Sequence, residues 1–311
     1  MSVIKELAES LDKKIEEVSN FLMSAPKKYK VYTIPKRTLG RRVIAQPSRE
    51  LKIYQKKYIE LHPFPAHAVA MAYCKKLSIK DNAQAHKNNT FLLKMDLENF
   101  FNSITPAIFW TEWQGFYTEP TLADKLILER LFFWSPNKRL DSGSKLILSI
   151  GAPSSPSLSN FIMYRFDEMT LLKCTEMNIS YTRYADDLTF SSNKKNILFD
   201  IPKIIQQHLT SIFNGKLRIN KNKTFFSSKG HNRHVTGITL TNNNTLSLGR
   251  DKKRYLKSLV HQFTLGRFDA DQLYHLQGWL AFAKHVDPIF IASLNKKYTS
   301  EIILAITKAQ K

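Results

Sequence analysis

Two adjacent carboxylates, Asp186 and Asp187, are the side chains of this sequence that most directly suggest chemistry. The flanking runs, residues 181–184 and 188–190, are rich in strand-forming side chains, so the pattern predicts a hairpin whose tight turn carries both acids. Neighbouring carboxylates repel one another unless a cation neutralises them. In a chain with a net charge of +21, the pair therefore indicates a divalent-metal site that handles phosphates. The alternative is a polar turn without function, the usual meaning of an isolated Asp-Asp pair.

A third carboxylate, Asp96, favours the metal site over the simple turn. It ends the mostly apolar, strand-like run 91–95, and Thr105 and Pro106 then supply a helix cap and a first helical residue. A carboxylate at the end of a buried strand and two at a hairpin tip can converge on two metal ions. Oxygen ligands favour Mg²⁺ or Mn²⁺. Two such ions, roughly 3.5–4 Å apart, stabilise the attacking and leaving oxygens of a phosphoryl displacement.

The composition is that of a basic globular protein. Lys and Arg total 47 against 26 Asp and Glu, which indicates a nucleic-acid partner, although a merely basic surface is the alternative. Cys74 and Cys174 form neither a disulfide framework nor a zinc spacing, and we expect both to be reduced. The N-terminal segment is too charged for a secretion signal, and no apolar run is long enough to span a membrane. We therefore expect a soluble, cytoplasmic protein.

Two strings of the sequence resemble the palm of reverse transcriptases. Residues 184–187, Tyr-Ala-Asp-Asp, lie downstream of Asp96, as the catalytic strings of that family do. Residues 151–156, Gly-Ala-Pro-Ser-Ser-Pro, continue to Asn160 and resemble the loop and helix start that support the templating base and the incoming nucleotide.

Two further strings are similar to signatures of the retron branch of that family. Residues 82–86, Asn-Ala-Gln-Ala-His, match its Asn-Ala-x-x-His string, and residues 235–237 match its Val-Thr-Gly triplet. The resemblance spans residues 30–300 in the family's order. On these residues the chain is identified as a member of the bacterial retron reverse transcriptases.

The resemblance implies an α+β, right-hand polymerase fold with an antiparallel palm sheet and a helical thumb. The expected parts are an N-terminal helix (1–28), fingers (29–89), a palm (90–240) with an inserted fingers segment at about 112–145, and a thumb (241–311). Spacing of apolar residues predicts one amphipathic helix over 3–23, a β-hairpin over 29–46, a helix from about Arg49 to Glu60 with Ser48 as its cap, and helices within 251–263 and 271–311.

The resemblance also implies the roles of the acids. Asp96 and Asp186 are expected to coordinate two Mg²⁺ ions, with Mn²⁺ as a substitute, and the Leu97 carbonyl is expected to complete one coordination shell. Asp187, which points the other way in a regular hairpin, is expected to be a weaker ligand or a charge behind the ligands.

Four residues are expected to contact the nucleotide. Arg42 matches the family's triphosphate contact, Phe101 its aromatic gate against a 2′-hydroxyl, Gly151 its motif glycine and Lys223 its late palm lysine. Lys223 suits a general acid toward pyrophosphate or, equally, a phosphate tether. Phe100 is expected to face the core, unless the two rings are exchanged. Lys36, Arg37 and Arg41 join Arg42 around the hairpin, either at phosphate or as solvated charges. Ile150 departs from the family, where Gln is common, which puts nucleotide affinity in doubt.

The retron strings and the first predicted thumb helix are the expected RNA contacts. Asn82 and His86 either touch the RNA or are a helix cap and a structural histidine. Val235, Thr236 and Gly237 are expected mainly to build a strand at the palm–thumb junction. Lys252, Lys253 and Arg254 are expected to follow the duplex backbone.

The implied function is reverse transcription of a structured retron non-coding RNA from dNTPs. The product would be branched, RNA-linked single-stranded DNA (msDNA), primed from a guanosine 2′-hydroxyl. The resemblance also implies anti-phage defence with a separate effector or toxin protein. The alternatives are another prokaryotic reverse transcriptase, of the intron or abortive-infection type, and a catalytically silent RNA-binding scaffold.

Overall fold

The computed structural model describes residues 2–35, 40–138, 140 and 143–308, which form two compact units. The first unit contains the chain up to Lys75, Lys94–Leu188 and Phe199–Phe225; the second contains Lys76–Leu93, Thr189–Leu198 and the chain from Phe226 onward. The second unit thus joins the predicted thumb to segments assigned above to fingers and palm. The predicted boundaries of these parts stay predictions.

The first unit begins with two helices instead of the single helix predicted over residues 3–23, so that prediction was wrong. Helix α1 (Val3–Ser10) begins at Ser2, whose side chain accepts a hydrogen bond from the Lys5 amide, and α2 (Ile15–Met23) follows. Between them Asp12 has a φ of 50°, a left-handed conformation that cannot continue an α-helix. The apolar spacing runs through both helices because both bury one face.

The predicted hairpin and its following helix are confirmed. Strands β1 (Tyr29–Pro35) and β2 (Arg41–Pro47) pair antiparallel, with Tyr29 opposite Pro47. Helix α3 (Arg49–Leu61) follows, and the Ser48 side chain accepts from the Leu51 amide at its start. Lys36 and Arg37 lie outside the described residues.

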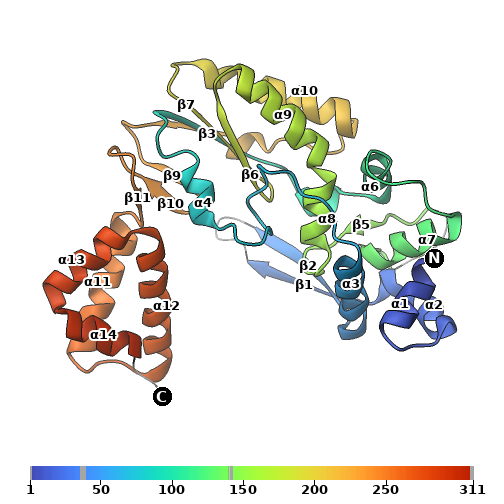
Figure 1. Ribbon diagram of the computed structural model, residues 1–311, viewed down its shortest axis with the longest axis horizontal. Helices are drawn as coiled ribbons and strands as arrows, with labels where there is room; N and C mark the ends of the chain where they lie inside the picture. The colour runs from blue at the N-terminus through green and yellow to red at the C-terminus, as the bar shows by residue number, and fades with distance from the viewer. Residues whose placement is uncertain (1, 36–39, 139, 141–142, 309–311) are drawn as a thin grey trace. The chain divides into compact units, whose positions relative to one another are not determined.

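A four-stranded sheet carries the predicted acids. Its strand order is β6 (Ser180–Tyr184), β7 (Asp187–Ser192), β3 (Phe91–Asp96) and β8 (Phe225–Ser228) (Figure 1). Strand β3 lies inside the sheet. Its Leu92 side chain is buried on one face of the sheet, and its Leu93 and Met95 side chains are buried on the other. In the first unit, helices α9 (Tyr164–Glu176) and α10 (Ile201–Phe213) lie beside one another. An internal strand with covered faces explains why residues 91–95 are mostly apolar.

The remaining elements of the first unit pack around an aromatic cluster. They are α5 (Phe100–Ser103), α6 (Pro106–Trp113), α7 (Leu122–Phe132), β4 (Phe133–Trp134), β5 (Ile147–Leu148), α8 (Ser155–Ile162) and 3-10 turns at Ala25–Lys27 and Lys221–Lys223; a further 3-10 turn, Ile197–Asp200, begins in the second unit and ends in the first. Helix α6 begins at Pro106, as predicted. The Phe64 ring lies 4.9–6.2 Å, between centroids, from four rings on these elements, those of Phe109, Trp113, Phe132 and Phe161. This cluster packs α6, α7 and α8 against one another.

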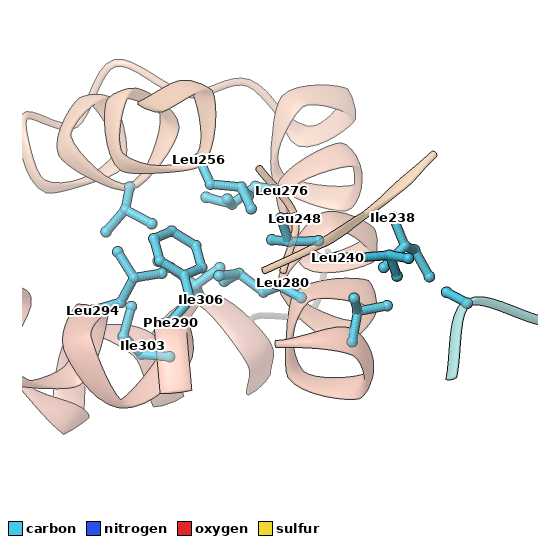
Figure 2. Close-up of a cluster of buried hydrophobic side chains, with 14 of the residues drawn as sticks. Ile238, Leu240, Leu248, Leu256, Leu276, Leu280, Phe290, Leu294, Ile303 and Ile306 are labelled. Atoms are coloured by element: carbon cyan, nitrogen blue, oxygen red, sulfur yellow. The ribbon is translucent and has the colours of Figure 1, made fainter. Parts of the chain in front are cut away.

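The second unit is built on its own apolar core, shown in Figure 2. Its elements are α4 (Ile79–Gln84), β9 (Arg233–Val235), β10 (Ile238–Leu240), β11 (Leu246–Ser247), α11 (Arg250–Thr264), α12 (Ala270–Val286), α13 (Pro288–Tyr298) and α14 (Ser300–Lys308). Leu256, Leu280 and Phe290 come from three of these helices and meet in the core. The predicted helical stretch from 271 is divided at Asp287, whose side chain caps α13 before Pro288.

Candidate active site

Asp96 lies at the end of β3, where a short segment before β8 meets it. The Lys223 ammonium donates to Asp96 Oδ2 at 2.7 Å, and Asn220 Nδ2 donates to Oδ1 at 3.3 Å. The Asn220 amide also donates to the Asp96 carbonyl at 2.7 Å, which fixes this segment along the strand. The structure therefore brings together Asp96 and Lys223, which are far apart in the sequence.

The predicted turn between β6 and β7 places the other two acids beside Asp96. Ala185 has a φ of 57°, so the two-residue turn takes a left-handed conformation as hairpin turns require. The Leu97 amide donates to the Asp186 carbonyl at 3.0 Å, which ties the turn to the end of β3. The structure confirms the predicted strand that ends at Asp96 and the predicted hairpin, and it places the hairpin turn beside Asp96.

The acids influence one another's protonation. Burial and then the Asp96 carboxylate raise the pKa of Asp186. Burial, Asp186 and Asp96 together raise the pKa of Asp187 to about 6. Partial burial lowers the pKa of Lys223, but the hydrogen bond and charge of Asp96 outweigh it, so this pKa is raised. The three carboxylates are therefore close enough to repel, which is the electrostatic environment that a cation relieves.

Among the residues described, no three His, Cys, Asp or Glu side chains are arranged as a group that holds a metal ion. The Asp96 carboxylate is turned toward Lys223 instead. The donor chemistry nevertheless fits: all the candidate ligands are hard oxygens, and their charges are mutually unfavourable. The metal ligands named above stay predictions.

A buried ion pair that the sequence analysis missed supports the hairpin that carries Asp186 and Asp187. Arg183 in β6 and Asp167 in α9 are both 0% exposed, with Arg183 Nη2 at 2.6 Å from Asp167 Oδ2. Arg183 also donates to Asn160 Oδ1 and to the Ala185 carbonyl, each at 3.1 Å. Since Ala185 directly precedes Asp186, this network anchors the turn. Its sequence signal is an arginine at an inward-facing strand position, but no spacing rule points to Asp167 as its partner.

A pocket of about 380 Å³ contains two of the predicted nucleotide residues. Burial and then the charge of Asp186 raise the pKa of Tyr73, which lines it, so that charge reaches the pocket. Its lining is Lys52, Tyr73, Phe101, Ser149, Ile150, Gly151, Ala152, Pro153, Ser155 and Pro156. Phe101 lines the pocket while Phe100 is buried at 2% exposure, so the two rings are placed as predicted. Gly151 has a φ of 125°, and a Cβ there would meet the Ala45 carbonyl oxygen at 3.2 Å. Only glycine fits at this position without strain. Lys52 and Tyr73 were not anticipated from the sequence.

Arg42 lies on β2 with an exposed side chain. Its charge, with that of Lys223, opposes the increase in the pKa of Asp186 that burial and Asp96 cause. Arg42 is therefore within electrostatic range of the acids. The neighbouring Arg41 is engaged with Thr33, to whose hydroxyl its Nε donates at 2.7 Å.

In the second unit the two retron strings contact one another. Asn82 and His86 are both 0% exposed. Asn82 Nδ2 donates to Thr236 Oγ1 at 3.5 Å, and the Thr236 hydroxyl donates to the Ile79 carbonyl at 3.2 Å. His86 Nδ1 lies 2.7 Å from Ser191 Oγ. Burial lowers the pKa of His86 to about 3, so the ring is neutral. These contacts favour a structural role for both residues, but Asn82 lies inside α4, whose cap is Ser78, so the helix-cap alternative for Asn82 was wrong.

Within the Val-Thr-Gly triplet, Val235 ends β9, while Thr236 and Gly237 form the turn before β10, so the predicted strand is confirmed for Val235 and wrong for the other two. Val235 is buried at 0% exposure, and Gly237 has a φ of 81° between β9 and β10. The Lys252 ammonium donates to the Gly237 carbonyl at 2.6 Å. Lys253 is paired with the buried Asp287 at 2.7 Å. Both lysines are thus engaged by the protein.

Arg254, by contrast, has an exposed side chain on α11. Of the three cations predicted on that helix, Arg254 is therefore the one best placed to reach a phosphate backbone.

No helix in the described part of the chain combines the length and apolar character needed to cross a membrane.

Comparisons with known proteins show the family of the chain. The reverse transcriptase (RNA-dependent DNA polymerase) family matches residues 34–240. The chain is 43% identical over 306 residues to the retron Ec83 reverse transcriptase of Escherichia coli, covering 97% of each chain. It is 30% identical over 298 residues to the retron Ec73 reverse transcriptase of Escherichia coli, covering 90% of each.

The fold is also similar to that of a telomerase from Candida albicans, solved in complex with a fragment of telomeric RNA. The TM-score is 0.50 at 11% identity, covering 91% of this chain and 61% of that one, so this likeness concerns the fold alone. The matched family and the near full-length relatives carry the assignment. The chain therefore belongs to the bacterial retron reverse transcriptases and is an RNA-directed DNA polymerase.

Proposed function

We propose that this polymerase copies a structured retron non-coding RNA into msDNA, beginning from a guanosine 2′-hydroxyl of that RNA. The observation that carries the catalytic part is the convergence of Asp96, Asp186 and Asp187 beside Lys223. The relatives named above support the retron part. The intron-type and abortive-infection alternatives lack a comparable observation in their favour.

The three acids are proposed to hold two Mg²⁺ ions, which Mn²⁺ can replace. Asp96 and Asp186 would be the main ligands with the Leu97 carbonyl, and Asp187 the weaker one. Bound metal ions lower the pKa of the attacking hydroxyl and neutralise the phosphates during nucleotidyl transfer. A silent scaffold is disfavoured, because three carboxylates that raise one another's pKa values are costly without a cation.

The chain's own cations are proposed to act on the triphosphate. Lys223 lies on Asp96 with a side chain that is 57% exposed, so it can turn toward a leaving pyrophosphate and either donate a proton or hold the phosphate. Arg42 would contact the triphosphate, since a guanidinium offers paired donors to phosphate oxygens. Phe101 and Gly151 would shape the pocket for a deoxynucleotide.

The RNA is proposed to lie along exposed cations such as Arg254, with Asn82, His86 and the 235–237 turn maintaining the second unit from within. The fingers, palm and thumb boundaries are proposed as in the sequence analysis. A cytoplasmic location and a role in anti-phage defence with a separate effector protein complete the proposal; it rests on resemblance to the retron branch.

The test is deoxynucleotide incorporation on a primed RNA template with Mg²⁺, repeated with the RNA encoded beside the gene. We expect activity in the wild type and in Glu176→Gln, an exposed acid on α9, and at least a roughly 1,000-fold loss in Asp186→Asn. DNA made from the neighbouring RNA should carry a 2′,5′ branch, which a debranching nuclease removes. A linear product would contradict 2′ priming, and equal activity of Asp186→Asn would contradict the metal site.

A further inference from the structure

The pocket of the first unit contains an aromatic side chain, Tyr73, to which the proposed function gives no role. Tyr73 lines the pocket with Phe101, Ile150 and Gly151. Tyr73 is 55% exposed, whereas aromatic side chains usually stabilise a protein by being buried. Burial and then the Asp186 carboxylate raise the pKa of Tyr73, so the phenol lies within range of that charge. The ring therefore borders an open space next to the acids.

The backbone at Tyr73 has a left-handed conformation. Its φ is 63°, in the left-handed region that bulky side chains rarely adopt. Glycine adopts this conformation without cost, so backbone preference alone would not select tyrosine there. Strain of this kind is typical of functional sites, where the surrounding structure imposes it.

The pocket offers few hydrogen-bonding groups to a bound sugar. Ile150 is apolar, and the Ser149 hydroxyl already donates to the Ala45 carbonyl. Ser155 also lines the pocket, but it is only 1% exposed, so its unpartnered hydroxyl offers almost no surface to a ligand. Within the described residues, the Tyr73 hydroxyl makes no hydrogen bond, so it is available to a ligand. Lys52 is the remaining polar group, and its charge suits a phosphate better than a sugar hydroxyl.

We propose that Tyr73 determines nucleotide selectivity: its ring packs against the sugar of the incoming deoxynucleotide, and its hydroxyl hydrogen-bonds the sugar 3′-hydroxyl. This inference rests on the proposed function and extends it. Phe101 would test the 2′ position by size, while Tyr73 would test the 3′ position by a hydrogen bond. The two tests are independent, because a steric gate and a hydrogen bond respond to different atoms of the sugar.

The experiment compares a deoxynucleotide with its 2′,3′-dideoxy analogue in wild type and Tyr73→Phe, measuring kcat and KM for single additions. Loss of one hydrogen bond should raise KM for the deoxynucleotide roughly five- to tenfold in Tyr73→Phe. The dideoxy analogue has no 3′-hydroxyl, so its kcat/KM should not change. Tyr274→Phe, an exposed tyrosine of the second unit, is the matched control and should behave as wild type. Ser155→Ala should leave the ratio between the two substrates unchanged.

A second variant, Tyr73→Gly, separates selectivity from folding. Because glycine relieves the left-handed strain, its thermal midpoint should be no lower than that of the wild type, while deoxynucleotide use falls. An unchanged preference for deoxy over dideoxy substrate in Tyr73→Phe would overturn the inference, as would equal losses for both substrates. A wild type that is silent even with the neighbouring RNA would instead contradict the proposed function itself.

Discussion

Removing the Asp167 carboxylate should strongly destabilise the first unit, because Arg183 would remain buried without its counter-charge. Both side chains are 0% exposed, and Arg183 Nη2 lies 2.6 Å from Asp167 Oδ2. Arg183 Nε donates to Oδ1 at 2.9 Å and to Oδ2 at 3.0 Å. Asp167→Leu removes all three contacts from a charge that water cannot reach. Loss of one partner from such a pair costs about 3–5 kcal/mol.

The measurement is urea unfolding followed by tryptophan fluorescence. With an m-value of about 3 kcal/mol/M, the midpoint should fall by about 1–1.7 M. Lys173→Met is the matched control, because Lys173 and Glu176 form a 2.9 Å ion pair on the same helix with exposed side chains. Loss of an exposed pair should cost about 0.2–1 kcal/mol. The comparison therefore isolates burial, since the helix and the distance are nearly the same.

A double variant, Asp167→Leu with Arg183→Met, decides whether the cost comes from an unpaired charge. Replacing both partners by apolar side chains of similar size should recover most of the lost stability. Its kcat should nevertheless stay low, because the Arg183 contact to the Ala185 carbonyl is gone and the turn before Asp186 is no longer held. A loss below about 1 kcal/mol in Asp167→Leu would refute this reasoning. So would a double variant no more stable than the single one.

Three further predictions concern His86, Gly151 and Phe101. Burial lowers the pKa of His86 from 6.5 to about 3. Below pH 6.5 the unfolded state therefore binds a proton that the folded state does not bind. Stability present above pH 6.5 should fall by about 2 kcal/mol at pH 5, and urea unfolding of His86→Gln should lack this component. Gly151→Ala should cost about 1–3 kcal/mol in thermal unfolding, since its φ is 125° and its Cβ would meet Ala45 at 3.2 Å. Gly278→Ala, in open space on α12, should instead gain up to about 1 kcal/mol. Phe101→Ala should lower the preference for deoxynucleotides over ribonucleotides by roughly 10–100-fold in single-addition kinetics, and an unchanged ratio would contradict the gate.

Sequence patterns predicted the elements whose signals are local. The β6–β7 turn, the apolar strand β3 and the start of α6 follow from strand propensity, burial and a Thr-Pro start, which act over a few neighbouring residues. The break between α1 and α2 was missed, because the apolar spacing continues across it and Asp12 carries no breaker signal comparable to glycine or proline. Periodicity reports which face is buried, and two consecutive helices that bury the same face give the same pattern.

Partnerships between distant residues could not be predicted in the same way. Lys253 looks like a free cation on an exposed helix, but its partner Asp287 lies beyond the whole of α12. The Lys252 ammonium likewise donates to the Gly237 carbonyl, in the turn between β9 and β10. Charge patterning along one helix carries no information about acids or carbonyls from other elements. Two of the three cations predicted to contact RNA from α11, Lys252 and Lys253, therefore form contacts within the protein that only the fold reveals.

The contact between Lys223 and Asp96 connects the two roles proposed for this lysine. A carboxylate that coordinates a divalent cation is neutralised by it, so its attraction for an ammonium weakens. The Lys223 side chain is 57% exposed and can move away from Asp96 without leaving a buried charge behind. Its raised pKa keeps it protonated at neutral pH. Binding of the metal-bound triphosphate would thus release a protonated lysine beside the leaving group. In the proposed function, the ion pair to Asp96 and a contact to pyrophosphate would therefore be successive positions of one side chain, from which Lys223 could act either as a general acid or as a phosphate tether.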